Sequence, residues 1–171
     1  MQSVSPPRWV LGIEAVLEAL GRTVAWLGLA MVVVMALVVV LRYWVGVGSI
    51  ALQEAVAYMH AALFMLGAGY TLKHDGHVRV DVLYRGWSSR GQAMVDLAGT
   101  VFLLFPFCIF VAWVSFDYVA SSVRVLEGSS EAGGLPGVFV LKALIPVMAV
   151  TVLLAGAARV GRAVHVIRSQ P

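Results

Sequence analysis

The stretch that decides the fold is residues 23–41, TVAWLGLAMVVVMALVVVL, which contains no charge between Arg22 and Arg42. Nineteen helical residues rise about 28 Å, which nearly spans the ~30 Å hydrocarbon core of a bilayer. The stretch is too long for the apolar segment of a secretory signal peptide, and the segment before it carries acidic residues. Cleavage near the small residues 46–48 is the alternative. The stretch therefore predicts a transmembrane helix.

The composition extends this conclusion to the whole chain. Of 171 residues, 61% are hydrophobic and 12% are charged, whereas a soluble domain carries about twice that charged fraction. The basic residues stand at the ends of apolar segments, a placement that indicates membrane topology and not nucleic-acid binding. Cys108 is the only cysteine and lies in an apolar stretch, so we interpret it as a small buried hydrophobic residue. No nucleotide-binding, hydrolase or metalloprotease motif occurs, so we expect neither an enzyme nor a cofactor.

Three further apolar runs follow the first. They lie between Glu54 and Lys73, after Gln92, and after the helix-breaking segment that ends at Pro136. The expected transmembrane helices are residues 23–43, 54–73, 92–118 and 137–160, in a single domain of residues 1–171 with a connection at 73–91 and a basic tail at 159–171. The third helix should bend at Pro106.

A short amphipathic helix is expected before the first span. Residues 8–22 place apolar side chains towards one side, a pattern typical of a helix lying in the membrane interface. These side chains are Trp9, Ile13, Val16, Leu17 and Leu20. The predicted fold class is thus an all-α membrane protein with four transmembrane helices, preceded by a short amphipathic N-terminal helix.

The distribution of basic residues predicts the orientation. If both termini are cytoplasmic, nine of the twelve basic residues lie on the cytoplasmic side, as the positive-inside rule requires. The nine are Arg8, Arg22, Lys73, Arg79, Arg85, Arg90, Arg159, Arg162 and Arg168. We therefore expect both termini in the cytoplasm of a cell with an inner membrane, and Arg42, Arg124 and Lys142 on the outside.

Charges beside apolar spans are the candidate contact residues, because a charge inside a bilayer is costly. Arg42 and Glu54 flank the first outside turn, where they would form an ion pair, reach interfacial water, or contact a partner protein or lipid head group. Lys142 would extend its side chain towards water, or bind a phosphate head group or a partner's carboxylate. Asp96 lies near the start of a helix, where the helix dipole favours an anion.

His60 is the one histidine within a span. A haem with two histidine ligands needs a second imidazole at the same depth, but His74, His77 and His165 lie beyond the ends of their helices. We therefore interpret His60 as a hydrogen-bonded packing residue.

The most distinctive segment is Gln53-Glu54, Tyr58 and residues 64–84, FMLGAGYTLKHDGHVRVDVLY. It resembles the small membrane (Q-type, DctQ-like) subunit of tripartite ATP-independent periplasmic (TRAP) transporters. In that family a Gly-Ala-rich helix end is followed by a basic residue and then Gly-His-(Val/Ile)-Arg-(Val/Ile)-Asp. Arg42-Tyr43 and residues 131–136, EAGGLP, also look like the family, so the resemblance covers about residues 15–160. Many relatives carry arginine or a large aromatic residue where this chain has Ala57, His60, Ala61 and Ala62.

The resemblance implies a subunit of a secondary transporter. In such systems a periplasmic protein captures an organic anion, commonly a carboxylate or sugar acid. A large membrane subunit of about twelve helices moves the anion inward on a sodium or proton gradient. The small subunit is a scaffold for the large one and helps to dock the periplasmic protein. The expected partners are therefore these two proteins and membrane phospholipids, without nucleic acid.

Within the motif, Arg79 and Asp81 alternate with valines, so we expect them at an interface with a partner or head groups, or paired with each other. Gly67 and Gly69 would permit close helix packing. Two other functions stay open from the residues alone: a self-contained small exporter, and a membrane anchor that holds a b-type haem.

Overall fold

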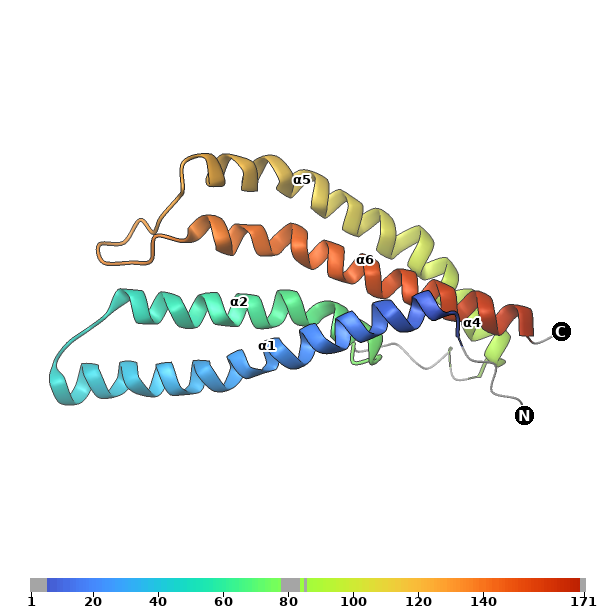
Figure 1. Cartoon of the computed structure of the whole chain (residues 1–171), viewed down its shortest axis with the longest axis horizontal. Helices are drawn as coiled ribbons and strands as arrows, with labels where there is room; N and C mark the ends of the chain where they lie inside the picture. The colour runs from blue at the N-terminus through green and yellow to red at the C-terminus, as the bar shows by residue number, and fades with distance from the viewer. Residues whose placement is uncertain (1–5, 78–83, 85, 170–171) are drawn as a thin grey trace.

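A computed structural model of the chain describes residues 6–77, 84 and 86–169, and within them every long element is a helix (Figure 1). The helices are α1 (Arg8–Val40) with the π-helical turn η1 (Leu41–Val45), α2 (Ile50–Lys73), α4 (Ser89–Gly99) continued by the π-helical turn η2 (Thr100–Leu104) and α5 (Phe105–Arg124), and α6 (Val138–Ser169). By length and composition, four continuous helical stretches can cross a membrane. The prediction of four spans is confirmed.

The helices are arranged in a row more than in a closed bundle. α6 lies between α2 and α5; α1 packs on the other side of α2 along most of its length and crosses onto α6 near its own start (Figure 1). The start of α1, the end of α2, the start of α4 and the end of α6 lie at one end, which we call the terminal end. The turn from η1 to α2 and residues 125–137 lie at the other end, which we call the loop end.

Small residues bring the helices of the row together. Of the residues in the most apolar window of each span, only 6–17% are buried inside the chain, so most of the surface faces outward. The buried residues of α6 are small: Ala149, Thr151, Ala155, Gly156, Ala158, Gly161 and Ala163. A Cβ at Gly161 would lie 2.6 Å from Val10 Cγ2 on α1. Close approach at small residues is how helices associate in lipid, where no hydrophobic force drives them together.

The expected separate amphipathic helix is wrong. Residues 8–22 are the first half of α1, which continues without a break into the span. Val10 and Leu17 are buried by the neighbouring helices, and a Cβ at Gly21 would lie 2.2 Å from the Tyr70 ring of α2. Of the five side chains expected on the apolar face, Leu17 is thus buried against protein, whereas Trp9 is 51% exposed and Val16 is 61% exposed. The 33 residues of α1 rise about 50 Å along the helix axis, which is well beyond the thickness of the hydrocarbon core.

Two of the helical stretches contain a π-helical turn. The first, η1, ends α1 at Gly46, whose φ of +75° suits glycine and reverses the chain towards α2. The second, η2, ends at Leu104, two residues before Pro106. Proline cannot donate the backbone hydrogen bond to the preceding turn, and a π-helical turn adjusts the helix at that point.

Candidate functional site

The ion pairs and the carboxylate hydrogen bonds that link different elements gather, among the described residues, in two clusters, one at each end of the row. The terminal cluster comprises Glu14, Glu18, Arg22, Lys73, His74, Asp75, Asp96, Arg159 and Arg162. The loop cluster comprises Glu54, Tyr118, Glu127, Ser129, Leu135 and Lys142. We consider each in turn.

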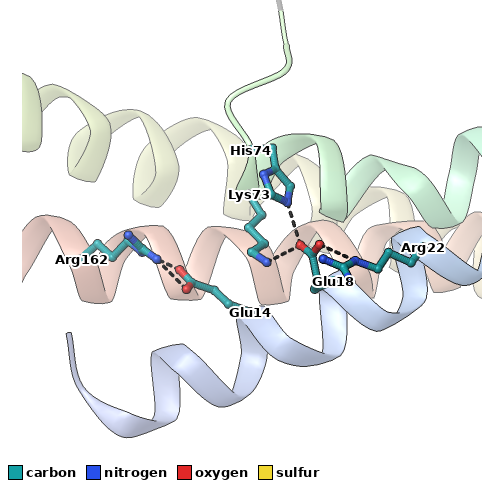
Figure 2. A network of polar contacts seen from close by, with 6 residues as sticks. All are labelled: Glu14, Glu18, Arg22, Lys73, His74 and Arg162. Atoms are coloured by element: carbon teal, nitrogen blue, oxygen red, sulfur yellow. Dashed lines mark hydrogen bonds and ion pairs between the residues drawn. The ribbon is translucent and has the colours of Figure 1, made fainter. Parts of the chain in front are cut away.

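Glu14 joins α1 to α6 in the terminal cluster (Figure 2). Arg162 donates from Nε to Oε1 and from Nη2 to Oε2 of Glu14, each at 2.5 Å. The Glu14 side chain is only 9% exposed, whereas the Arg162 side chain is 56% exposed. A buried carboxylate needs such a partner, and the two-pronged geometry also fixes the relative rotation of the two helices.

Glu18, one helical turn further along α1, joins that helix to the end of α2 (Figure 2). Its Oε2 lies 2.6 Å from Lys73 Nζ and 2.8 Å from His74 Nε2. Its Oε1 accepts from Arg22 Nε at 2.8 Å. Lys73 and His74 belong to the Gly-Ala-Gly-Tyr-Thr-Leu-Lys-His stretch, so part of the distinctive motif holds α2 against α1.

Arg159 completes the terminal cluster by joining α6 to Asp75 within the motif and to Asp96 of α4. Its Nη2 lies 3.1 Å from Asp75 Oδ1 and 3.2 Å from Asp96 Oδ2. Asp96 also accepts from the Tyr84 hydroxyl at 3.0 Å. These residues line a cavity of about 480 Å³. Asp96 therefore has a structural role beyond the helix dipole.

Glu54 organises the loop cluster. One carboxylate oxygen accepts from the Ser129 hydroxyl, and the other accepts from the Leu135 N–H at 2.6 Å. The Ser129 N–H donates to the Leu135 carbonyl at 2.9 Å, which closes the loop on itself. A Cβ at Gly134 would lie 2.8 Å from Glu54 Oε2. Because Gly134 has no side chain, the backbone of the Gly-Gly-Leu-Pro run can approach the Glu54 carboxylate of α2 closely.

Lys142 is bound inside the chain. Its Nζ lies 2.5 Å from Glu127 Oε2 and 4.1 Å from the centroid of the Tyr118 ring. The ammonium therefore has an anion and the face of an aromatic ring as partners, both from the same end of the row. This pair ties the end of α5 and the following loop to the start of α6.

The Glu127–Lys142 pair predicts a pH dependence. The Lys142 ammonium lowers the pKa of the Glu127 carboxyl below its ordinary value of 4.5. Because the pKa of Glu127 is lower in the folded chain, the pair contributes its full stabilisation of the loop at pH values above the ordinary pKa. This contribution is lost as the pH falls through the lowered pKa of the folded chain. We expect the protection of residues 125–137 against hydrogen exchange, measured relative to the intrinsic exchange rate at each pH, to fall on acidification below about pH 4.5. In Lys142→Met the exchange should already be fast at neutral pH, and an unchanged pH profile in that variant would contradict the assignment.

The predicted contact residues divide into three groups. Glu54 and Lys142 have partners within the chain. Arg42 is exposed and forms no ion pair with Glu54 or any other described residue, so the expected hairpin ion pair is not formed. Arg79 and Asp81 lie outside the described residues.

The interpretation of His60 as a hydrogen-bonded packing residue is wrong. His60 is exposed on the surface of α2, and its ring lies against Phe64 with the centroids 4.6 Å apart. Its imidazole makes no hydrogen bond with the described residues. The location of His60 within an apolar span did not predict the side of the helix on which its side chain lies.

Sequence reasoning also missed the ion pairs of the terminal cluster. Glu14 and Glu18 fell in the segment expected to lie in the membrane interface, and Arg159 and Arg162 fell in the basic tail, where they served only to predict the orientation. One signal was present in the sequence: Val10, Glu14 and Leu17 share a helix face, which puts a carboxylate on the apolar side. Such a residue requires a cation from another helix.

Comparison with known proteins identifies the family of this chain. The family model described as "Tripartite ATP-independent periplasmic transporters, DctQ component" matches residues 31–166, most of the chain and all or part of each of the four spans. No curated protein and no solved structure matches the chain.

Proposed function

We propose that this chain, which belongs to the DctQ component family of tripartite ATP-independent periplasmic transporters, is the scaffold on which the other two proteins of such a transporter assemble. This is a family of transporters and not of enzymes. It holds the large membrane subunit within the bilayer and helps to dock a periplasmic substrate-binding protein. The complex takes up an organic anion, a carboxylate or sugar acid, on an ion gradient.

The observation that carries this proposal is the row of helices with its charges paired at the two ends. The described carboxylates lie towards the ends of the spans, and most of them are engaged by cations or loop groups of the same chain. A self-contained exporter would instead place a carboxylate deep within a span to couple transport. A row of helices with exposed apolar faces is suited to bind a larger membrane protein.

The orientation belongs to the same proposal. The terminal end carries Arg8, Arg22, Lys73 and the arginines of α6, whereas the loop end carries Arg42, Arg124 and Lys142. The positive-inside rule then puts the terminal end and both termini in the cytoplasm of a bacterial cell. The loop end faces the periplasm.

The loop of residues 125–137 is the part of this chain that we assign to docking. Glu54 and Lys142 hold the loop from two helices, while Glu131 and its neighbours are exposed. A loop held in one conformation presents its surface to a soluble partner with little entropy loss on binding.

Co-purification and transport together test the proposed function. Tagged chain expressed with the large membrane subunit of the same transporter should elute with it in a defined ratio. Proteoliposomes should take up the anion only when both membrane subunits and the periplasmic protein are present. Uptake or export by this chain alone would overturn the proposal, as would elution free of the large subunit.

A further inference from the structure

The exposed residues of α2 form one stripe. They are Ile50, Gln53, Ala57, His60 and Phe64, and every other residue of this helix is partly or fully covered. Their spacing of three, four, three and four residues is the spacing of the contact positions in a coiled coil. Gly67 continues the stripe with the same step, and a Cβ there would meet nothing within 4 Å.

The chemistry of this α2 stripe does not suit lipid. His60 lies close to the middle of α2, and it makes no hydrogen bond with the described residues. Lipid tails offer no hydrogen-bond partner, so an imidazole facing them is unfavourable. Gln53 raises the same difficulty nearer the loop end. Ala57 and Gly67 in turn offer little apolar surface to lipid but let another backbone approach closely.

Another helix of the same chain provides the contrast. Between residues 101 and 114 every exposed residue is apolar. Phe102 is 75% exposed and Trp113 is 80% exposed, as expected of a surface that meets lipid tails. The polar and small character of the outward face of α2 contrasts with this apolar surface.

The stripe also leads into a groove. Ala68, one turn beyond Phe64 on the same side of α2, lines an apolar groove of about 700 Å³. Its other walls come from His77, from the helical stretch Ser89–Arg124 and from α6, the last two at residues that include Leu103, Phe107 and Val152. A helix seated along the α2 stripe could extend apolar side chains into this groove.

We propose that the α2 stripe is the seam against which one transmembrane helix of the large membrane subunit packs, with a hydrogen-bonding side chain of that helix opposite His60. The proposal rests on the proposed function and adds to it the face, the packing geometry and the chemistry of the contact. The heptad spacing fits a helix that crosses α2 at a shallow angle, as in left-handed coiled coils. Gly67 marks a point of close approach.

Photo-crosslinking in the assembled complex tests the face directly. A benzophenone amino acid is placed at His60 or at Phe64, and in the control at Trp113, with the large subunit and the chain co-expressed. We expect adducts with the large subunit from positions 60 and 64 and none from position 113. Adducts from position 113 alone, or adducts at 60 and 64 with lipid or a second copy of this chain, would overturn the seam. If the subunits do not co-purify at all, the proposed function itself fails.

A matched pair of glycine substitutions tests the packing. Gly67→Leu and Gly12→Leu both put a side chain into open space on a helix of this chain, so both variants should fold. Gly67→Leu should abolish co-purification, whereas Gly12→Leu should leave it unchanged. His60→Leu should weaken association about 3- to 20-fold, the range for one interhelical hydrogen bond in a membrane. Undiminished association of both Gly67→Leu and His60→Leu would contradict the proposal.

Discussion

Gly69→Ala is expected to destabilise the isolated chain by about 1–3 kcal/mol, and Gly69→Leu to prevent its folding. Gly69 is buried where α2 meets both α1 and α6. A Cβ at this position would lie 2.7 Å from the Thr151 carbonyl oxygen and 3.0 Å from Leu17 Cδ2. The backbone of α6 cannot move away without separating the helices, so the added methyl group weakens the packing of α2 against α1 and α6. Thermal unfolding in detergent measures the effect.

Gly67→Ala is the matched control for that experiment. It lies on the same helix two residues earlier, but a Cβ there has open space. Alanine is favoured over glycine within a helix by about 1 kcal/mol, so this variant should be as stable as the parent chain or slightly more stable. Equal losses in Gly67→Ala and Gly69→Ala would show that helix flexibility, and not close packing, explains the effect.

Replacement of Glu54 is expected to release the loop of residues 125–137 and to abolish coupled uptake. In Glu54→Ala the Ser129 hydroxyl and the Leu135 N–H both lose their acceptor. Glu54→Gln keeps one carbonyl oxygen and no charge, so it should fall between the parent chain and the alanine variant. Hydrogen exchange at the Leu135 amide should accelerate about tenfold or more in Glu54→Ala, because local opening then requires no hydrogen bond to α2 to break.

Glu131→Ala is the control for Glu54. Glu131 belongs to the same loop and is also a carboxylate, but its exposed side chain makes no hydrogen bond with the described residues. The exchange rate at Leu135 should stay close to that of the parent chain. If Glu131→Ala accelerates exchange as much as Glu54→Ala does, then loop charge matters and the Glu54 contacts do not.

The apolar runs and their charged ends were enough to predict the spans. The absence of charge from residue 23 to 41 leaves a helix across the bilayer as the stable state, because backbone groups in lipid must be satisfied internally. The motif around Gly69 and Lys73 likewise indicated the family, which the family model over residues 31–166 confirms.

The roles of single charges were harder to predict, because they depend on partners far away in the chain. Glu14 and Arg162 are separated by 148 positions and meet only because α1 packs across α6. Glu54 and Leu135 are separated by 81 positions, and the contact needs the bare backbone at Gly134. Nothing in local spacing distinguishes such a carboxylate from one that reaches water.

By itself, then, the sequence determined four membrane-spanning helices and the family, since both follow from local hydropathy and from a contiguous motif. Tertiary structure alone decided that residues 8–22 continue α1, that Glu54 holds a loop, and that His60 faces outward while Gly69 lies inside. The physical reason is that hydropathy sets the depth of a residue in the bilayer. Its direction around the helix is set by which neighbours pack there.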